Sequence, residues 1–130
     1  MPNGAIVWRD LTVPDAEAIK EFYSQVIGWQ TKPHPMGGYD DFNVIISDTG
    51  ETIAGICHAR GGNAGIPPQW LMYVEVDDLR QCVERCKELG GAVVHGPRSI
   101  GTHNFCVIQD PAGAVIGLIE AVTPAESLPQ

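Results

Sequence analysis

Histidine is the side chain best suited to carry protons or bind metals near neutral pH. The chain has four histidines (His34, His58, His95 and His103), and all of them fall in or beside predicted loops. No two have the i, i+4 spacing of a helical metal site. We interpret His58 and His103 as candidates for the rim of a ligand cavity, with His103 also a candidate proton carrier. A metal site that uses them is the alternative.

The cysteines indicate structural thiols. There are four, Cys57, Cys82, Cys86 and Cys106, and their spacing contains no Cys-x-x-Cys pair, so a zinc knuckle is not indicated. Cys82 and Cys86 lie one helical turn apart, which leaves a metal or redox pair as an alternative. Free cysteine is among the most buried residue types, and we therefore interpret all four as inert buried thiols.

Two carboxylates could supply acid–base chemistry. Side chains alternate along a strand, so Asp10 shares a face with Trp8, and Glu75 shares a face with Leu71 and Tyr73. If these faces look into a cavity, Asp10 is a candidate acid and a buried Glu75 a candidate base, because burial raises a carboxyl pKa. The alternative is that both carboxylates point to solvent, with Asp10 paired to a neighbouring arginine.

Two helices must position these residues. The first is predicted within Val13–Trp29, with Asp15 as N-cap and Gly28 as C-terminal stop. The second is predicted within Val76–Gly91, with Asp77 or Asp78 as N-cap and Gly90–Gly91 as the stop. Each has an apolar stripe at helical spacing. The stripes consist of Ile19, Phe22, Tyr23 and Val26, and of Leu79, Cys82, Val83, Cys86 and Leu89.

The two helices belong to two copies of one unit. Val13 and Val76 stand 63 residues apart, and the closing segments DTGETIAGI and DPAGAVIGL stand 62 apart. Each copy has the order strand, helix and then about three strands, so the chain is predicted to be an α+β protein of two tandem βαβββ repeats. The boundaries are residues 5–58 for repeat one, 59–69 for a Gly/Pro-rich linker, 70–121 for repeat two and 122–130 for a tail, all within a single domain.

The strands of each repeat follow from short apolar runs bounded by turn residues. They are predicted at Ala5–Thr12, Gln30–Lys32, Asp41–Ser47, Thr52–Cys57, Trp70–Val76, Ala92–His95, Asn104–Asp110 and Ala114–Ala121. The stretch Lys32–Phe42, KPHPMGGYDDF, is predicted as a loop that could cover a cavity or simply face solvent. Arg60 and Arg98 are the cations placed nearest the expected cavity mouth, where they could meet an anionic ligand.

These features resemble the vicinal oxygen chelate superfamily, which includes glyoxalase I, extradiol dioxygenases and bleomycin resistance proteins. The resemblance covers about Ala5 to Ala121. It rests on VPD and VDDL before the helices, GW and GG after them, the run W-x-x-Y-x-x-V-D-D and the segment DPAGAVIGLIE. The sequence looks most like the metal-poor, glyoxalase-like bacterial members. The resemblance implies that the two repeats form cupped mixed sheets around a shared cavity, and that the protein is a homodimer.

The resemblance also implies where a metal would bind. In metal-dependent relatives, His, Gln and Glu ligands come from the first and last strand of each repeat. The matching positions here are Trp8, Gly55, Leu71 and Gly117, none of which offers a lone pair to a cation. We therefore expect no metal and no other cofactor.

Loss of these ligands predicts a roomier, more apolar cavity wall. Our leading hypothesis is a metal-free protein that binds a small apolar or aromatic molecule. Its ligand-binding residues would be Trp8, Gly55, Cys57, His58, Trp70, Leu71, Tyr73 and Gly117. The alternatives are a metal-independent acid–base enzyme (lyase- or isomerase-like) acting on a small carbonyl compound, a metal-dependent lyase or dioxygenase with relocated ligands, and a cavity filled by the protein's own aromatic side chains.

Composition limits the partners. The 130-residue chain has a formal net charge of −8 and a pI near 4.7, which argues against nucleic acid and against anionic membranes. No apolar run approaches a membrane span, and the first residues lack a signal-peptide pattern. We therefore expect a cytoplasmic protein.

Overall fold

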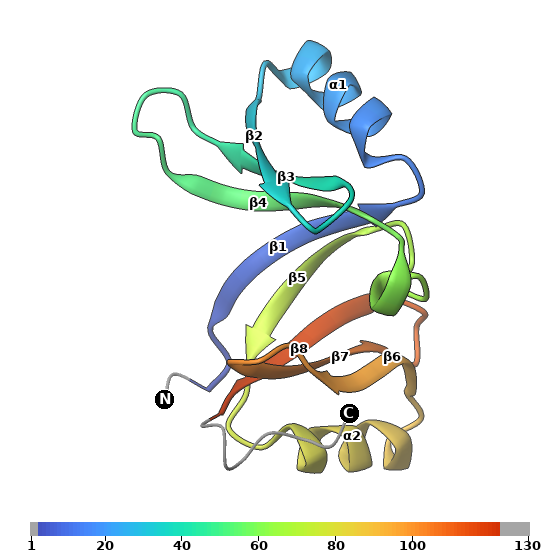
Figure 1. Cartoon of the computed structure of the whole chain (residues 1–130). Coiled ribbons are helices and arrows are strands. Elements are labelled where there is room, and N and C mark those ends of the chain that lie inside the picture. Colours follow the sequence, from blue (N-terminus) through green and yellow to red (C-terminus); the bar gives the residue numbers. More distant parts are fainter. Residues whose placement is uncertain (1–2, 123–130) are drawn as a thin grey trace. The chain divides into compact units, whose positions relative to one another are not determined.

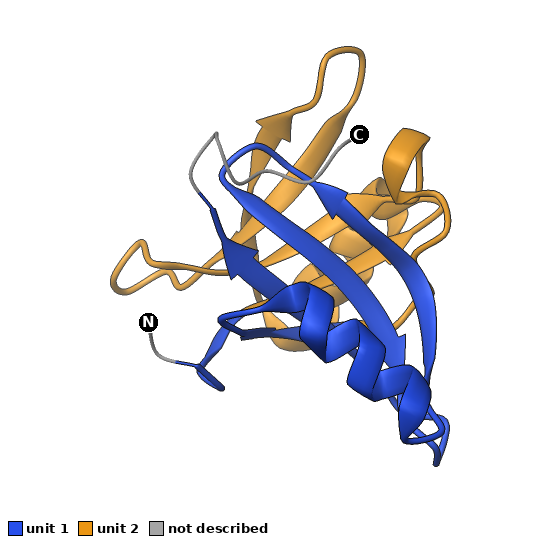
Figure 2. Cartoon of the chain, turned by 90° about the horizontal axis from the view of Figure 1, so that it is seen from below, with its two compact units in different colours: residues 1–7, 71–130 blue, residues 8–70 orange. Residues whose placement is uncertain are grey.

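The computed structural model describes residues 3–122 and divides the chain into two compact units (Figures 1 and 2). Unit 2 comprises residues 8–70 and holds the first repeat. Unit 1 comprises residues 1–7 and 71–130 and holds the second. Within residues 3–122, eight strands and two α-helices confirm the α+β class and the two βαβββ repeats. The predicted tail, 122–130, lies outside the described residues except for Val122.

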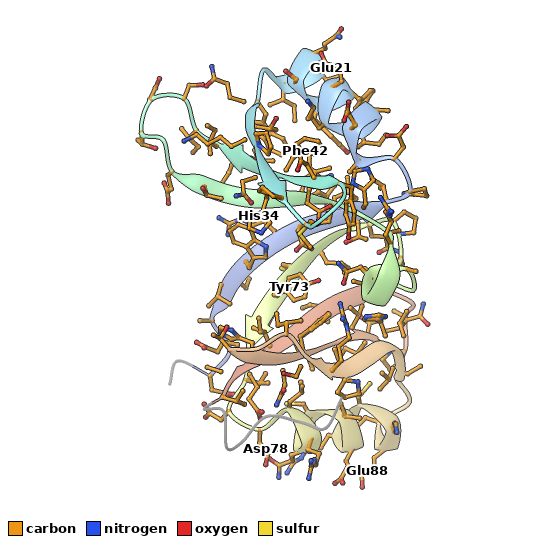
Figure 3. The ribbon with its side chains drawn as sticks, in the orientation of Figure 1. Glu21, His34, Phe42, Tyr73, Asp78 and Glu88 are labelled. Carbon is orange, nitrogen blue, oxygen red and sulfur yellow. The ribbon has the colours of Figure 1, made fainter. Side chains whose placement is uncertain are left out.

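Unit 2 is built around the first helix. Its elements are β1 (Ile6–Val13, which begins in unit 1), α1 (Ala16–Ile27), β2 (Gln30–Pro35), β3 (Asp40–Ile45), β4 (Thr52–His58) and a 3₁₀ turn at Gly61–Asn63. The strand order is β2-β3-β4-β1, with β1 parallel to β4 and the other pairs antiparallel. Alternate residues of three strands pack under α1, including Leu11, Ile56 and Phe42, the last of which is labelled in Figure 3.

Unit 1 repeats this plan. Its elements are β5 (Trp70–Glu75), α2 (Leu79–Glu88), β6 (Ala92–Ser99), β7 (His103–Gln109) and β8 (Val115–Ala121), in the order β5-β8-β7-β6. β5 is parallel to β8, and the other pairs are antiparallel. The core under α2 contains Leu79, Val83, Cys106 and Leu118. In each unit one face of the sheet is therefore covered by a helix, and we call the opposite face the helix-free face.

The predicted helix ends are confirmed. Asp15 Oδ1 accepts a hydrogen bond from the Ala18 N–H, and Asp78 Oδ1 accepts one from Gln81 N–H, so Asp78 and not Asp77 is the second N-cap. Gly28 ends α1 with φ of 87°, a left-handed conformation that favours glycine. The stretch Asp-Pro-Ala-Gly that starts at Asp110 has the composition of a turn, and the structure confirms this, because Asp110 Oδ1 accepts hydrogen bonds from the Ala112 and Ala114 N–H groups.

Three predictions about the elements were wrong. Phe22, Val26 and Leu89 are exposed (55%, 64% and 76%), because each helix meets only one sheet face and the buried stripe is narrower than the apolar pattern. Lys32–Phe42 is mostly a hairpin of β2 and β3, closed where Met36 N–H bonds to Tyr39. His34 and His95 lie inside strands, because β2 and β6 both extend further than predicted and, as edge strands, tolerate proline.

Candidate functional site

The helix-free face of unit 2 brings three predicted site residues together at Gly55. Gly55 lies opposite Asp10 in the parallel pairing of β1 and β4. A Cβ at Gly55 would stand 3.3 Å from Asp10 Cβ, 3.6 Å from Cys57 Sγ and 3.8 Å from Trp8 Cζ2. Trp8 Nε1 donates a hydrogen bond of 3.2 Å to Asp10 Oδ2. The indole, the carboxylate and the thiol therefore surround the glycine.

This face is acidic. Asp41 is buried and neighbours Phe42, whose side chain lies on the helix side, so alternation places Asp41 on the helix-free side. Burial, and then the nearby Asp10 and Asp41 carboxylates, raise the pKa of the Cys57 thiol above its usual range. Cys57 is therefore a neutral thiol at physiological pH, and the chemistry of this face rests on its carboxylates and its indole.

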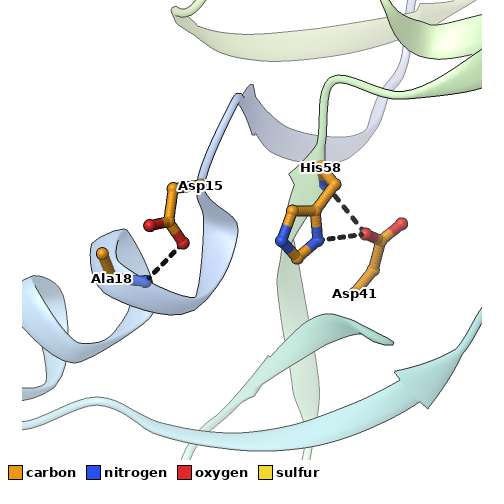
Figure 4. A network of polar contacts seen from close by, with 4 residues as sticks. All are labelled: Asp15, Ala18, Asp41 and His58. Carbon is orange, nitrogen blue, oxygen red and sulfur yellow. Dashed lines mark hydrogen bonds and ion pairs between the residues drawn. The ribbon is translucent and has the colours of Figure 1, made fainter. Parts of the chain in front are cut away.

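His58 is the last residue of β4 in the same unit, and it lies next to the start of α1 (Figure 4). Asp41 Oδ1 accepts the His58 backbone N–H at 2.8 Å and lies 3.4 Å from His58 Nδ1. The ring contacts Tyr39 and Phe42. A surface pocket of about 590 Å³ is lined by His58 and by residues of the helix start, Asp15, Glu17, Ala18, Lys20 and Glu21. The ring nitrogen that faces Asp41 is thus fixed by a buried carboxylate.

The helix-free face of unit 1 is aromatic. Gly117 lies opposite Tyr73, and a Cβ at Gly117 would collide with the Tyr73 ring. The predicted space at Gly117 is thus covered by a ring of the protein itself. Tyr73 contacts Phe105 with ring centroids 6.3 Å apart, and both side chains are buried. Leu71, on the same side of β5, is also buried.

Other predicted site residues lie apart from these clusters. Glu75 is half-buried, and its backbone bonds to Gly4 and Ala5. His103 begins β7, with Nδ1 2.8 Å from Thr102 Oγ1. Trp70 packs away from the face that carries Tyr73, because its ring contacts Trp29 and Tyr23 beside α1 and its Nε1 donates to Tyr23 Oη at 3.0 Å.

Sequence reasoning missed Phe105 and His95 as members of the aromatic cluster, and it placed Arg98 near a cavity mouth without its contact with Phe105. Phe105 sits between His95, at 5.7 Å between ring centroids, and Arg98, whose Cζ is 5.0 Å from the ring centroid. Alternation along β7 from the buried Cys106 could have placed Phe105 on the helix-free side. Two register shifts between β6 and β7 bring His95 and Arg98 to the same ring, and no sequence signal predicted them.

The residues at the positions of a family metal site do not fit a metal. Two of the four positions are glycines, whose side-chain space is bordered by Trp8 and Asp10 in unit 2 and filled by Tyr73 in unit 1. Within residues 3–122, no group of three or more His, Cys, Asp or Glu side chains is arranged to hold a metal ion. No described helix has both the length and the apolar character needed to cross a membrane.

Residues 5–118 match the family model described as the Glyoxalase/Bleomycin resistance protein/Dioxygenase superfamily. The chain belongs to this superfamily. The repeat architecture and the family match thus agree, and the resemblance noted from the sequence is confirmed.

The relatives of this chain include proteins of two different lengths. CFP32 of Mycobacterium tuberculosis, provisionally named a glyoxylase, is 34% identical over 92% of this chain and 46% of its own length. The anthracycline biosynthesis protein DnrV of Streptomyces peucetius is 30% identical over 88% of this chain and 46% of its own. The chain thus spans about half of these relatives. Lactoylglutathione lyase of Neisseria meningitidis is 31% identical over 91% of both chains.

Solved structures show the same fold. Streptomyces coelicolor methylmalonyl-CoA epimerase in complex with 2-nitronate-propionyl-CoA matches with a TM-score of 0.52 and 14% identity, covering 93% of this chain and 99% of that one. At this identity the likeness concerns the fold alone.

Proposed function

We propose that this superfamily member binds a small aromatic or apolar molecule without a metal, on helix-free faces of its repeats. The observation that carries the proposal is the pairing of a strand glycine with an aromatic side chain in both units. Gly55 has the Trp8 indole nearby, and Gly117 lies against the Tyr73 ring. Flat aromatic side chains with few polar groups are the usual lining of small-molecule sites.

Polar groups near each aromatic side chain support a binding role. In unit 2 the Trp8 N–H and the half-buried Asp10 stand together, and in unit 1 His95 and Arg98 flank Phe105. A few fixed polar groups in an apolar wall orient a ligand and set its specificity. The name of the relative DnrV, an anthracycline biosynthesis protein, supports a planar aromatic ligand class.

The first test is a ligand screen by NMR with aromatic fragments and an anthracycline aglycone, using ¹⁵N-labelled protein. We expect shifts at residues such as Trp8, Gly55, Tyr73 and Gly117. Trp8→Ala should weaken binding to the unit 2 face about tenfold, the size of an aromatic contact in a site. Trp70→Ala is the matched control, because Trp70 packs beside α1. Shifts confined to other surfaces would overturn the proposal.

The metal-free part of the proposal has its own measurement. Untagged protein purified without chelator is analysed for Zn, Ni, Mn and Fe. We expect far less than one metal per chain, because the four family ligand positions hold Trp8, Gly55, Leu71 and Gly117. A stoichiometric metal would contradict this part and redirect attention to His58 and His103.

Metal-independent acid–base catalysis on a small carbonyl compound is the second candidate. The half-buried Asp10, held by the Trp8 N–H, favours it, as does the similarity to a lactoylglutathione lyase. Turnover of methylglyoxal with glutathione, assayed in the presence of EDTA, tests it. Activity that Asp10→Asn reduces by 10²-fold or more would support this candidate, and no activity in the wild type would exclude it for this substrate.

The homodimer remains a prediction, to be checked by light scattering.

A further inference from the structure

The helix-free face of unit 1 carries a cluster of two aromatic rings, an imidazole and a guanidinium. The Phe105 ring on β7 is contacted by three side chains from two other strands. His95 lies 5.7 Å away between centroids, Arg98 places its guanidinium carbon 5.0 Å from the ring centroid, and Tyr73 lies 6.3 Å away. A cation over an aromatic ring is attracted by the ring face. The cluster therefore holds two nitrogen-bearing side chains against a buried pair of aromatic rings.

One of these nitrogen atoms is left without a partner. His95 Nε2 is buried and has no hydrogen bond within residues 3–122. Buried polar atoms are nearly always paired, and an unpaired one costs about 1–3 kcal/mol. The His95 residue as a whole is half-buried, and the torsion about its Cβ–Cγ bond is soft, so a rotation of the ring can present Nε2 to a ligand. Such an atom is suited to a ligand.

The electrostatics of the cluster favour an anionic ligand group. Burial and the charge of Arg98 lower the pKa of His95, so the imidazole is neutral near pH 7 while Arg98 keeps its charge. The neutral Nε2–H tautomer and the guanidinium are both donors. The corresponding face of unit 2 carries Asp10 and Asp41, which would repel an anion. The two faces thus differ in the ligand group that each would accept.

We propose that His95 and Arg98 form a carboxylate-binding subsite, and that the ligand of the unit 1 face is a small aromatic carboxylic acid whose ring packs beside the buried pair Tyr73 and Phe105. This inference rests on the proposed binding function and adds the ligand class to it. Arg98 supplies the charge, and His95 supplies a directed N–H. A carboxylate that accepts hydrogen bonds from both side chains would give the buried His95 Nε2 a partner.

The test compares two probes of the same ring and nearly the same shape. 1-Naphthoate carries the carboxylate, and 1-naphthalenemethanol lacks it. Isothermal titration at pH 7.5 should show that 1-naphthoate binds at least tenfold more tightly than 1-naphthalenemethanol. In the ¹⁵N spectrum of the labelled protein, 1-naphthoate should shift the resonance of His95 Nε2. Arg98→Gln should remove the preference. Arg98→Lys, which keeps the charge, should retain part of it.

Arg60→Gln is the matched control. Arg60 also stacks on an aromatic ring, with its guanidinium carbon 4.1 Å from the Tyr39 ring centroid, but it belongs to unit 2. This variant should bind both probes as the wild type does. Equal binding of the two probes to the wild type, or a preference that survives in the His95→Asn/Arg98→Gln double variant, would overturn the subsite. Failure of both probes to bind would count against the proposed function itself.

Discussion

The two helix-free faces occupy equivalent positions in their repeats yet differ in chemistry. Asp10 lies opposite Gly55 and Tyr73 lies opposite Gly117, so a carboxylate in one repeat corresponds to a phenol ring in the other. The pairings Phe42–Ile56 and Cys106–Leu118 likewise make Asp41 equivalent to Phe105. The face of unit 2 is therefore acidic and the face of unit 1 aromatic.

The helix-covered faces, in contrast, have the same aliphatic chemistry in both repeats. Leu11 pairs with Ile56, and at the equivalent place Val74 pairs with Leu118, so aliphatic side chains face the helix in both repeats. These positions are fixed by the need to bury an apolar stripe of the helix. The helix-free positions are not under that constraint and have diverged. The comparison assigns fold stability to the helix-covered side of each sheet, and under the proposed function it leaves the helix-free side to set ligand specificity.

The largest expected effect concerns the two glycines. In Gly117→Ala the new methyl group would clash with the Tyr73 ring, so the ring must move. We expect the free energy of unfolding to fall by about 1–3 kcal/mol, as in other overpacked sites. Gly55→Ala meets Asp10 Cβ only at 3.3 Å and should cost less. Urea unfolding measures both.

The double variant Tyr73→Ala/Gly117→Ala separates the clash from any general effect of alanine in a strand. Removing the ring removes the clash, so the cost of Gly117→Ala should largely vanish in the Tyr73→Ala background. An equal loss of unfolding free energy in Gly55→Ala and Gly117→Ala would contradict the difference between the two faces.

The next effect concerns thiol reactivity. Cys57 is next to the carboxylates of the acidic face and Cys106 is buried, and their pKa values are raised, that of Cys106 to about 12. Since the thiolate is the nucleophile, iodoacetamide at pH 8 should modify both at least tenfold more slowly than Cys86, as read by peptide mass spectrometry. Asp10→Asn should accelerate modification of Cys57 and leave that of Cys106 unchanged. Rapid labelling of Cys57 in the wild type would contradict the acidic character of the face.

A smaller effect distinguishes the two helix starts. Asp15→Ala removes the N-cap of α1 and should cost about 1 kcal/mol. Asp78→Ala should cost less, because Glu120 Oε2 still accepts the Leu79 N–H at 2.7 Å. The double variant Asp78→Ala/Glu120→Ala should then lose more stability than Asp15→Ala does. Thermal unfolding of the four proteins, including the wild type, gives the ranking.

The smallest effect is the pH dependence due to His95. Its pKa is lowered in the folded protein from 6.5, so the unfolded chain binds more protons just below that pH. Stability should therefore fall as the pH drops through 6.5, and His95→Gln should reduce this slope. Urea midpoints at pH 7.5 and 5.5 for the two proteins test the sign. A steeper slope in the variant would show that His95 is not disfavoured as a cation.

Much of the fold was predictable because its signals are local. The duplication, both N-caps, the stop at Gly28 and the Asp110 turn follow from a few residues each, and the structure confirms them. The strand ends around His34 and His95 were less predictable, because nearby prolines suggest loops. Edge strands accept proline, and the position of a strand within the sheet cannot be read from its own residues.

The candidate site was predictable only in part. Alternation correctly grouped Trp8 with Asp10, because both lie on one strand. The Tyr73 ring over Gly117 joins two strands far apart in the sequence, and the contacts of Phe105 with His95 and Arg98 depend on register shifts between β6 and β7. Such contacts come from three-dimensional packing, so they have no pattern along the chain.

The first strand has a consequence for the order in which the protein is made. The Gly4 N–H bonds to the Glu75 carbonyl, Glu75 N–H bonds to Ala5, and Asp77 N–H bonds to the Asn3 side chain, so residues 3–5 complete unit 1. During synthesis these residues leave the ribosome about seventy positions before their partners. A split gene that produced the two repeats as separate polypeptides would leave this edge of the second repeat open, whereas a circular permutant that carries the first seven residues after its own end could close it.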